Sequence, residues 1–423
     1  MGQKIDRTYL FERMPVGQAV RRQIIPSIAS QMVILLYNLA DTYFVGLLND
    51  AAQTAAVSLA YSVTLLMTAL ANLFAVGGAG RIAQLLGRRD RDGAREVCAV
   101  SFWFALLASA AFCVLFTLLS SPILRLCGAT DETYALACGY SRWVISVGGT
   151  FSILNTVLAN LIRADGSAFA ASMGVSAGGI INMLLDPLFV LPRFLGMGAE
   201  GAGLATAISN AAGMLILLGI IAARRRVGVV ALRPGDLRAA RRHIGRILRI
   251  GLSSAVQFLL TLVAVGALTK FMSLYDTAAV AALGIVKKLD MLPLYFSIGV
   301  ANGLLPLLAY NYSAESHERR HRLFLCGCAV AVGFSVVCVA GYEVFAPALV
   351  RIFIGDAQTI AYGTKLLRIM VLAMPMMSVC YPMITQFQAM GRMRESLICS
   401  ILRKGSLDIP LLFVLNALFP LYG

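Results

Sequence analysis

The chain has 423 residues, of which 59% are hydrophobic and 13% are charged, and it carries a formal net charge of +15. Soluble domains are about 25% charged, and one core could not bury this much apolar surface, so a soluble globular protein is excluded. We expect an all-α polytopic membrane protein that exposes its apolar surface to the lipid bilayer.

The N-terminal residues 1–22 carry charges and no apolar core region, so they predict a cytoplasmic arm and no cleavable signal peptide. Apolar runs follow that are long enough to cross a bilayer as helices, which takes about 20 residues each. Prolines and glycines within them, such as Pro26, Gly148 and Pro375, predict helices that bend around a cavity. The runs cover residues 23–48, 55–80, 97–119, 136–160, 170–191, 202–223, 250–272, 278–310, 323–345, 363–386 and 396–419.

The basic residues predict the orientation of these spans. Most of the 36 lysines and arginines lie in the N-terminal arm or after an even-numbered run. Loops rich in Lys and Arg stay on the cytoplasmic side, so we expect a multi-pass protein of the cell's plasma membrane with a cytoplasmic N-terminus. The positive charge is therefore explained by the orientation of the chain in the membrane, and a nucleic-acid partner is not expected.

Short motifs repeat along the chain at a nearly constant offset. Leu185-Asp186-Pro187-Leu188 resembles Asp408-Ile409-Pro410-Leu411, and Gly80 has its counterpart in Gly303. This predicts two pseudo-symmetric six-helix lobes in parallel orientation, a known transporter plan. The expected units are an N-lobe at 23–223, a cytoplasmic linker at 224–249 and a C-lobe at 250–423. The C-lobe ends one helix short of symmetry, either by truncation or because further sequence follows.

A lone carboxylate, Asp41, lies in the first apolar run. At membrane depth it costs roughly 2.5–3.5 kcal/mol, and such groups usually face a wet cavity or a partner. Asn38 lies on the same helical face. The alternative is that Asp41 only hydrogen-bonds a neighbouring helix.

The fifth and sixth runs carry further polar groups at a similar depth. Asn182 and Asp186 are one helical turn apart, Thr206 lies in the outer half of the next run, and Asn155, on the fourth run, lies deeper. The oxygens of these side chains and of Asp41 suit a proton or a hard cation such as Na⁺, with Asp41 and Asp186 as the metal ligands if Na⁺ binds. The alternative for Asp186 is that it caps a helix break before Pro187.

Other polar or adaptable side chains within the runs are expected to line a substrate cavity. Lys287 and Asp290 could instead lie near the outer mouth and reach water, and a methionine-rich run could be plain packing. The sequence shows no nucleotide-binding loop, zinc-protease signature or serine-nucleophile elbow, so we expect neither an enzyme nor a cofactor. The candidate cavity residues are Tyr37, Asn38, Gln257, Lys287, Asp290, Met374 and Gln386.

An ordered set of motifs resembles the multidrug and toxic compound extrusion (MATE) family over nearly the whole chain. They are YNLADTYFVG at 37–46, VGGAGRIAQLLGRRD at 76–90, RADGSAFAASM at 163–173, LLDPLFV at 184–190, GAGLATAIS at 201–209, AYNYSA at 309–314 and MGRMRES at 390–396. The resemblance implies twelve helices in two lobes around a V-shaped cavity. It also implies antiport of organic, often cationic, small molecules against H⁺ or Na⁺, and we expect a monomer.

The family's functional positions map onto Asp41, Asn182, Asp186, Thr206 and Asn155. Some members carry an acidic residue where this chain has Gln257, which favours a cation site in the first lobe. A lipid-linked precursor flippase of the same broad fold stays open as an alternative, and it should show several cations facing the cavity. The candidates for those cations are Arg142, Lys270, Lys287, Lys288 and Arg368. The substrate, the choice between H⁺ and Na⁺ and the physiological role also stay open at this point.

Overall fold

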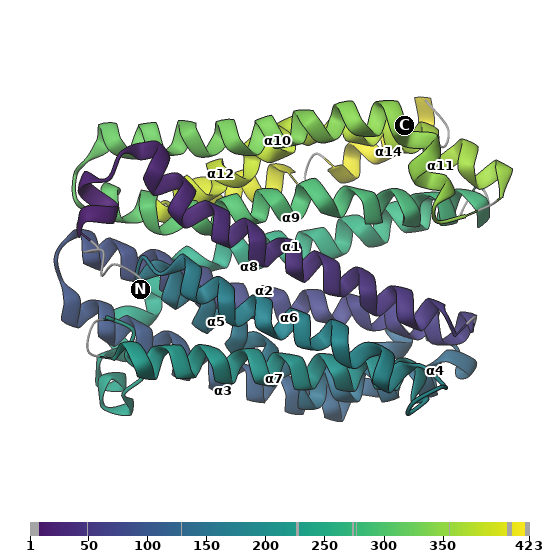
Figure 1. Cartoon of the computed structure of the whole chain (residues 1–423), viewed down its shortest axis with the longest axis horizontal. Helices are drawn as coiled ribbons and strands as arrows, with labels where there is room; N and C mark the ends of the chain where they lie inside the picture. The colour runs from purple at the N-terminus through teal and green to yellow at the C-terminus, as the bar shows by residue number, and fades with distance from the viewer. Residues whose placement is uncertain are drawn as a thin grey trace.

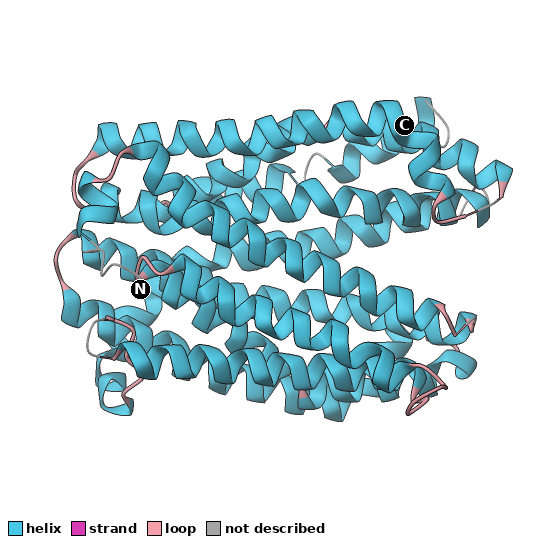
Figure 2. Cartoon of the chain, viewed as in Figure 1, coloured by secondary structure: helices cyan, strands magenta, loops and turns pink. Residues whose placement is uncertain are grey.

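The structure is a computed structural model that describes residues 8–48, 50–127, 129–225, 228–272, 275, 277–354, 356–403 and 408–418. Within these ranges the chain is helical almost throughout and contains no strand, and its loops lie mainly at the two ends of a long helix bundle (Figure 2). The helices are η1 (Tyr9–Arg13), α1 (Val16–Gly46), α2 (Ala51–Gly87), α3 (Arg91–Leu126), α4 (Asp131–Ser141), η2 (Arg142–Val147), α5 (Gly149–Ala164), α6 (Ala168–Val190), α7 (Gly198–Arg224), η3 (Pro234–Ala239), α8 (Ala240–Met272), α9 (Thr277–Ser313), α10 (His317–Arg351), α11 (Ala357–Val371), α12 (Met374–Met390), α13 (Met393–Ile401) and α14 (Asp408–Leu418).

The predicted membrane spans agree with this architecture. Among the described residues, eight helices are long and apolar enough to cross a membrane, or ten if two bent helix pairs each count as one span. Each of the first ten predicted runs lies largely on one of these helices or pairs. The eleventh, 396–419, includes residues outside the described ranges, and α13 and α14 occupy the rest of it. The all-α polytopic fold class is confirmed.

Two spans are bent by the same angle. The helices before and after Gly148 meet at 46°, and so do α11 and α12. Gly148 precedes the first residue of α5, and Pro375 lies in the first turn of α12, where it removes a backbone donor that would continue the preceding helix. The bends predicted from Gly148 and Pro375 are therefore present.

The first helix runs between the two lobes. In Figure 1, α1 begins beside the helices of the second lobe and ends beside those of the first. It packs against α9 of the second lobe and against α6 of the first. A change in the shape of α1 would therefore be felt in both lobes.

Two helix pairs, α2 with α8 and α1 with α9, join the lobes at one end of the bundle. This end carries η1 and the arginine-rich junction of α2 and α3, and we call it the basic end. A Cβ atom on Gly251 of α8 would lie 1.8 Å from the carbonyl oxygen of Leu73 on α2. One on Gly303 of α9 would lie 2.7 Å from Cα of Ile24 on α1. Only glycine permits backbones to approach so closely, so the lobes are sealed together here.

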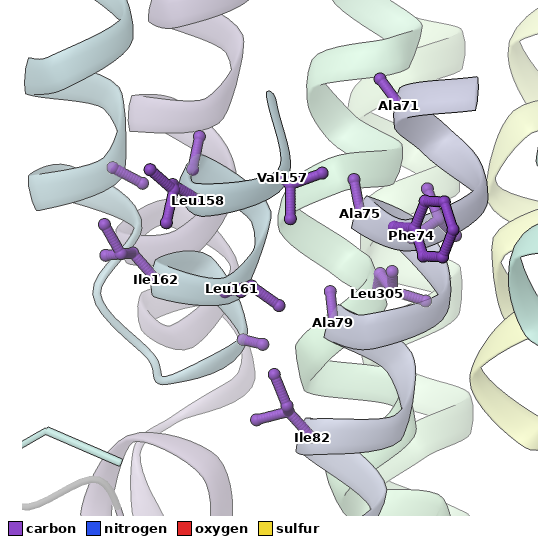
Figure 3. Packing of buried hydrophobic residues seen from close by; sticks show 14 of the residues in the cluster. Ala71, Phe74, Ala75, Ala79, Ile82, Val157, Leu158, Leu161, Ile162 and Leu305 are labelled. Carbon is purple, nitrogen blue, oxygen red and sulfur yellow. The ribbon is translucent and has the colours of Figure 1, made fainter. Parts of the chain in front are cut away.

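Small side chains also let α2 pack closely inside the first lobe. Ala71, Ala75 and Ala79 are spaced one turn apart on α2, and Figure 3 shows this face turned towards Val157 and Leu161 of α5. Because lipid tails are as apolar as the helices, such pairs are held mainly by van der Waals contact, which needs small residues at the interface. The α2–α5 contact makes the first lobe a stable wall for the site described below.

The N-terminal segment is folded against the second lobe. Phe11 is fully buried and stacks on Tyr310 of α9, with ring centroids 4.6 Å apart. The guanidinium of Arg319 on α10 donates to the carbonyl oxygens of Phe11 at 2.8 Å and Met14 at 2.6 Å. Leu10 and Phe11 also lie beside Gly166, in the α5–α6 loop of the first lobe. The segment thus contacts both lobes at the basic end.

Replacing Arg319 by alanine is expected to release this segment. The change removes two charge-assisted hydrogen bonds, each worth about 1.5–3 kcal/mol, so the melting temperature should fall and trypsin should cleave more readily after Arg13. The control is Arg322→Ala, since Arg322 forms an exposed pair with Glu318 that contributes at most about 1 kcal/mol. Equal protease resistance in the two variants would contradict this role for Arg319.

Candidate functional site

A cavity of about 580 Å³ lies between the lobes. Its walls come from α1, α2 and α4 to α7 of the first lobe and from α8, α9 and α12 of the second. On α1 the lining begins at Gln31, beyond the contact of Ile24 with Gly303. The cavity therefore extends from the sealed basic end towards the opposite end.

Asp41 lies on the wall of this cavity, near the end of α1. Its side chain is 8% exposed, and one carboxylate oxygen, Oδ2, accepts a hydrogen bond of 3.4 Å from the hydroxyl of Tyr140 on α4. The other oxygen, Oδ1, is buried and has no hydrogen-bond partner among the described residues. One face of this carboxylate is thus available to a proton or a cation.

Asp186 lies in the interior of the first lobe and does not line the cavity. It is completely buried on α6, and its Oδ1 accepts a hydrogen bond of 3.4 Å from Nδ2 of Asn182. The same amide nitrogen lies 3.3 Å from the hydroxyl oxygen of Thr206 on α7, to which it donates. Helix α1, which carries Asp41, packs against α6, which carries Asp186. The structure therefore brings together the two helices whose acidic residues the sequence placed at similar depth.

Two asparagines extend this polar network towards the cavity. Asn155 of α5 donates to Oδ1 of Asn210 on α7 at 3.4 Å, and Asn210 donates to the backbone oxygen of Thr206 at 2.9 Å. Asn210 was not among the predicted residues, although it follows Thr206 by one helical turn, the same spacing that singled out Asn182 and Asp186.

The donor set fits a proton or a hard cation. Buried oxygens on Asp41, Asp186, Asn182 and Asn155 have no hydrogen-bond partner among the described residues. Carboxylate and amide oxygens are the ligands of hard cations, and a carboxylate can instead take a proton. Among the described residues, no group of three or more His, Cys, Asp and Glu side chains is arranged so that it could hold a metal ion.

The predicted cavity residues divide into two groups. Tyr37, Asn38 and Gln257 line the cavity, and Nδ2 of Asn38 donates across it to the hydroxyl of Tyr295 at 3.4 Å. Lys287, Asp290, Met374 and Gln386 are not among its lining residues.

Neighbouring residues line the cavity in place of most of these. On α9, Lys288 and Met291 line it, next in sequence to Lys287 and Asp290. Met374 is 2% exposed and packs in the apolar core of the second lobe with Leu367 and Val371. On α12, the cavity-lining residues near Gln386 are Thr385 and Gln388.

Several residues that line the cavity were not among those predicted from the sequence. Tyr61, Tyr295 and Tyr381 place three phenol rings on the cavity walls. Tyrosine is common near membrane interfaces, so it gave no distinct signal. Of the five cations named as candidates for a flippase, only Lys288 lines the cavity. Arg163, which lies between the fourth and fifth predicted runs, also lines it.

Comparison with known proteins agrees with this geometry. The MatE family profile matches residues 26–188 and 250–414. The multidrug export protein MepA of Staphylococcus aureus strain NCTC 8325 is 29% identical over 421 residues, which cover 99% of this chain and 92% of that protein.

Solved structures share the fold over almost the whole chain. An outward-facing multidrug resistance MATE family transporter of the MOP superfamily is 25% identical with a TM-score of 0.90, covering 97% of this chain and 91% of that one. A MOP superfamily transporter from Pyrococcus furiosus Vc1 is 25% identical with a TM-score of 0.92, and the match covers 100% of this chain and 93% of that one. The two-lobe fold, the cavity and the family match together show that this chain belongs to the MatE family of multidrug and toxic compound extrusion transporters.

Proposed function

We propose that this transporter is a secondary active antiporter that exports organic, cationic or amphipathic compounds in exchange for H⁺ or Na⁺. The observation that carries the proposal is the buried pair of carboxylates, Asp41 and Asp186, beside a cavity large enough for an organic molecule. The similarity to MepA, a multidrug export protein, supports the same function. The flippase is not favoured, because the chain matches the MatE family over both halves.

The coupling ion would bind at the cluster of Asp41, Asn182, Asp186 and Thr206, with Asn155 at its edge. Two carboxylates in a medium of low dielectric constant repel each other. Binding of one positive charge at the site would reduce this repulsion. The substrate would bind in the adjacent cavity, against Tyr37, Asn38 and Gln257.

Ion binding would act on transport through α1. An ionised Asp41 only accepts hydrogen bonds, whereas a protonated one also donates, so its bond with Tyr140 would be rearranged. Because α1 packs on both lobes, bending it near Asp41 would narrow the first-lobe side of the cavity and release substrate. The ion can shift this equilibrium only by binding one conformation more tightly than the other.

The moving units in this scheme are the N-lobe at 23–223 and the C-lobe at 250–423. The arm 1–22 and the linker 224–249 would lie on the cytoplasmic side, in agreement with their positive charge. Helix α1 begins at Val16 and α8 at Ala240, so the arm and the linker are each partly helical. We propose that the protein works as a monomer in the plasma membrane.

Transport by purified protein in vesicles tests the proposal. A fluorescent organic cation is present at equal concentration inside and outside the vesicles, and a pH gradient and a Na⁺ gradient are imposed in separate experiments. One of the two gradients is expected to drive dye movement against its concentration gradient. Dye movement that ignores both gradients would contradict ion-coupled antiport.

A further inference from the structure

A buried guanidinium lies on the cavity wall, on the side of the basic end. Arg163 is the penultimate residue of α5, is 2% exposed and lines the cavity. Most buried cations in proteins are paired with a carboxylate, because removing a charge from water is expensive. A cation in this position therefore needs an explanation.

The protein itself leaves this guanidinium only partly satisfied. Nη2 donates to the hydroxyl oxygen of Ser30 on α1 at 3.1 Å, whereas Nε is buried and has no hydrogen-bond partner among the described residues. No ion pair between described residues includes Arg163. The negative end of the α5 dipole offers it a partial countercharge worth about 1 kcal/mol, which is much less than a carboxylate would provide.

The charges along the cavity are unevenly placed. Its charged lining residues are Asp41, Arg163 and Lys288, so among the described residues two cations face one carboxylate. Ser30, the partner of Arg163, precedes Asp41 by eleven residues on α1, or roughly 16 Å along the helix axis. When Asp41 is engaged by a coupling ion, the cavity wall keeps two positive charges.

We propose that Arg163 binds a negatively charged group, such as a carboxylate, of the transported compound. This inference rests on the proposed function, since it places an organic substrate in the same cavity. The guanidinium can form two parallel hydrogen bonds with a carboxylate, and its Nε is the donor left for one of them. The substrates that the cavity favours are then zwitterionic or amphipathic compounds that carry a negative group, with that group at the basic end and the remaining part beside Tyr61, Tyr295 and Tyr381.

A matched pair of dyes tests this role. A rhodamine with a free benzoate and its methyl ester share the same cationic ring system and differ in one negative charge. Binding is measured by fluorescence anisotropy with the purified protein, and transport is measured in vesicles. On the wild-type protein the benzoate dye should bind more tightly than its ester.

The variants separate binding from structure. Arg163→Gln should weaken binding of the benzoate dye by about tenfold or more, the effect of losing a charge-assisted hydrogen bond, and change binding of the ester less than about twofold. Arg163→Lys should restore part of the difference between the dyes. Ser30→Ala, which removes only the internal partner, and Arg142→Gln, which removes a cation that does not line the cavity, should keep the preference for benzoate.

Each outcome has a distinct meaning. An equal loss for both dyes in Arg163→Gln would show a purely structural arginine and overturn the inference, while ion-driven transport of the ester would leave the proposed function standing. If Arg163→Gln does not fold, the wild-type preference decides, and tighter binding of the ester overturns the inference. Failure of the wild-type protein to transport either dye would contradict the proposed function and this inference with it.

Discussion

Asp41→Asn is expected to reduce ion-driven dye transport to the level of vesicles without protein. Asparagine keeps the shape of the side chain and its hydrogen bond with Tyr140, but it cannot take up a proton or neutralise a bound cation. The protein should fold and melt no lower than wild type, because the change removes a costly buried charge. The variant is therefore expected to lose ion-coupled transport while it stays folded. Transport is measured as dye movement under imposed pH and Na⁺ gradients.

A second carboxylate on the same side of the bundle provides the control. Asp50 caps α2 by accepting hydrogen bonds from the backbone nitrogens of Ala52 and Gln53, and it does not line the cavity. Asparagine is an equally good helix cap, so Asp50→Asn should transport like wild type. Coupled transport by Asp41→Asn at the wild-type rate would remove Asp41 from the mechanism.

Gly251→Val is expected to abolish transport and lower stability. A β-carbon at this position would lie 1.8 Å from the carbonyl oxygen of Leu73 and closer than 3 Å to two further atoms of that residue's backbone. Since backbone cannot rotate away as a side chain can, α2 and α8 must separate, at a cost of about 1–3 kcal/mol or more. The melting temperature of the purified protein should fall, and the seal between the lobes should be lost.

The same helix offers a matched control for this substitution. Gly266 also lies on α8, and a β-carbon there would meet nothing within 4 Å. Gly266→Val should therefore melt and transport nearly as the wild-type protein does. If both variants behave alike, close contact of α2 with α8 is not what holds the lobes together at the basic end.

Much of the fold could be predicted because the membrane imposes simple rules. A run of about 20 apolar residues predicts a span, and a lone charge within it, such as Asp41 or Asp186, stands out. The helical rise of ~1.5 Å per residue then places both carboxylates at one depth, and the helices that carry them, α1 and α6, pack together.

The residues that escaped prediction share a physical cause. On α9, Lys287 and Lys288 are adjacent in sequence, so the sequence does not indicate which of the two lines the cavity, and Lys287 was chosen where Lys288 lines it. Arg163 follows an apolar run and is basic, which is also typical of a cytoplasmic loop, yet α5 continues to Ala164 and holds it inside. Met374 is flexible and apolar, and such a side chain fills a core as readily as a cavity wall.

The bends in the two halves match in position and in angle. The second helices of the bent pairs begin at Gly149 and Met374, positions separated by nearly the same offset as the repeated motifs, and both angles are 46°. The residues that cause the break differ, since one half uses glycine and the other proline. Equal angles made by unequal residues indicate that the shape of the bent span, rather than the residue at the break, is what the two halves have in common.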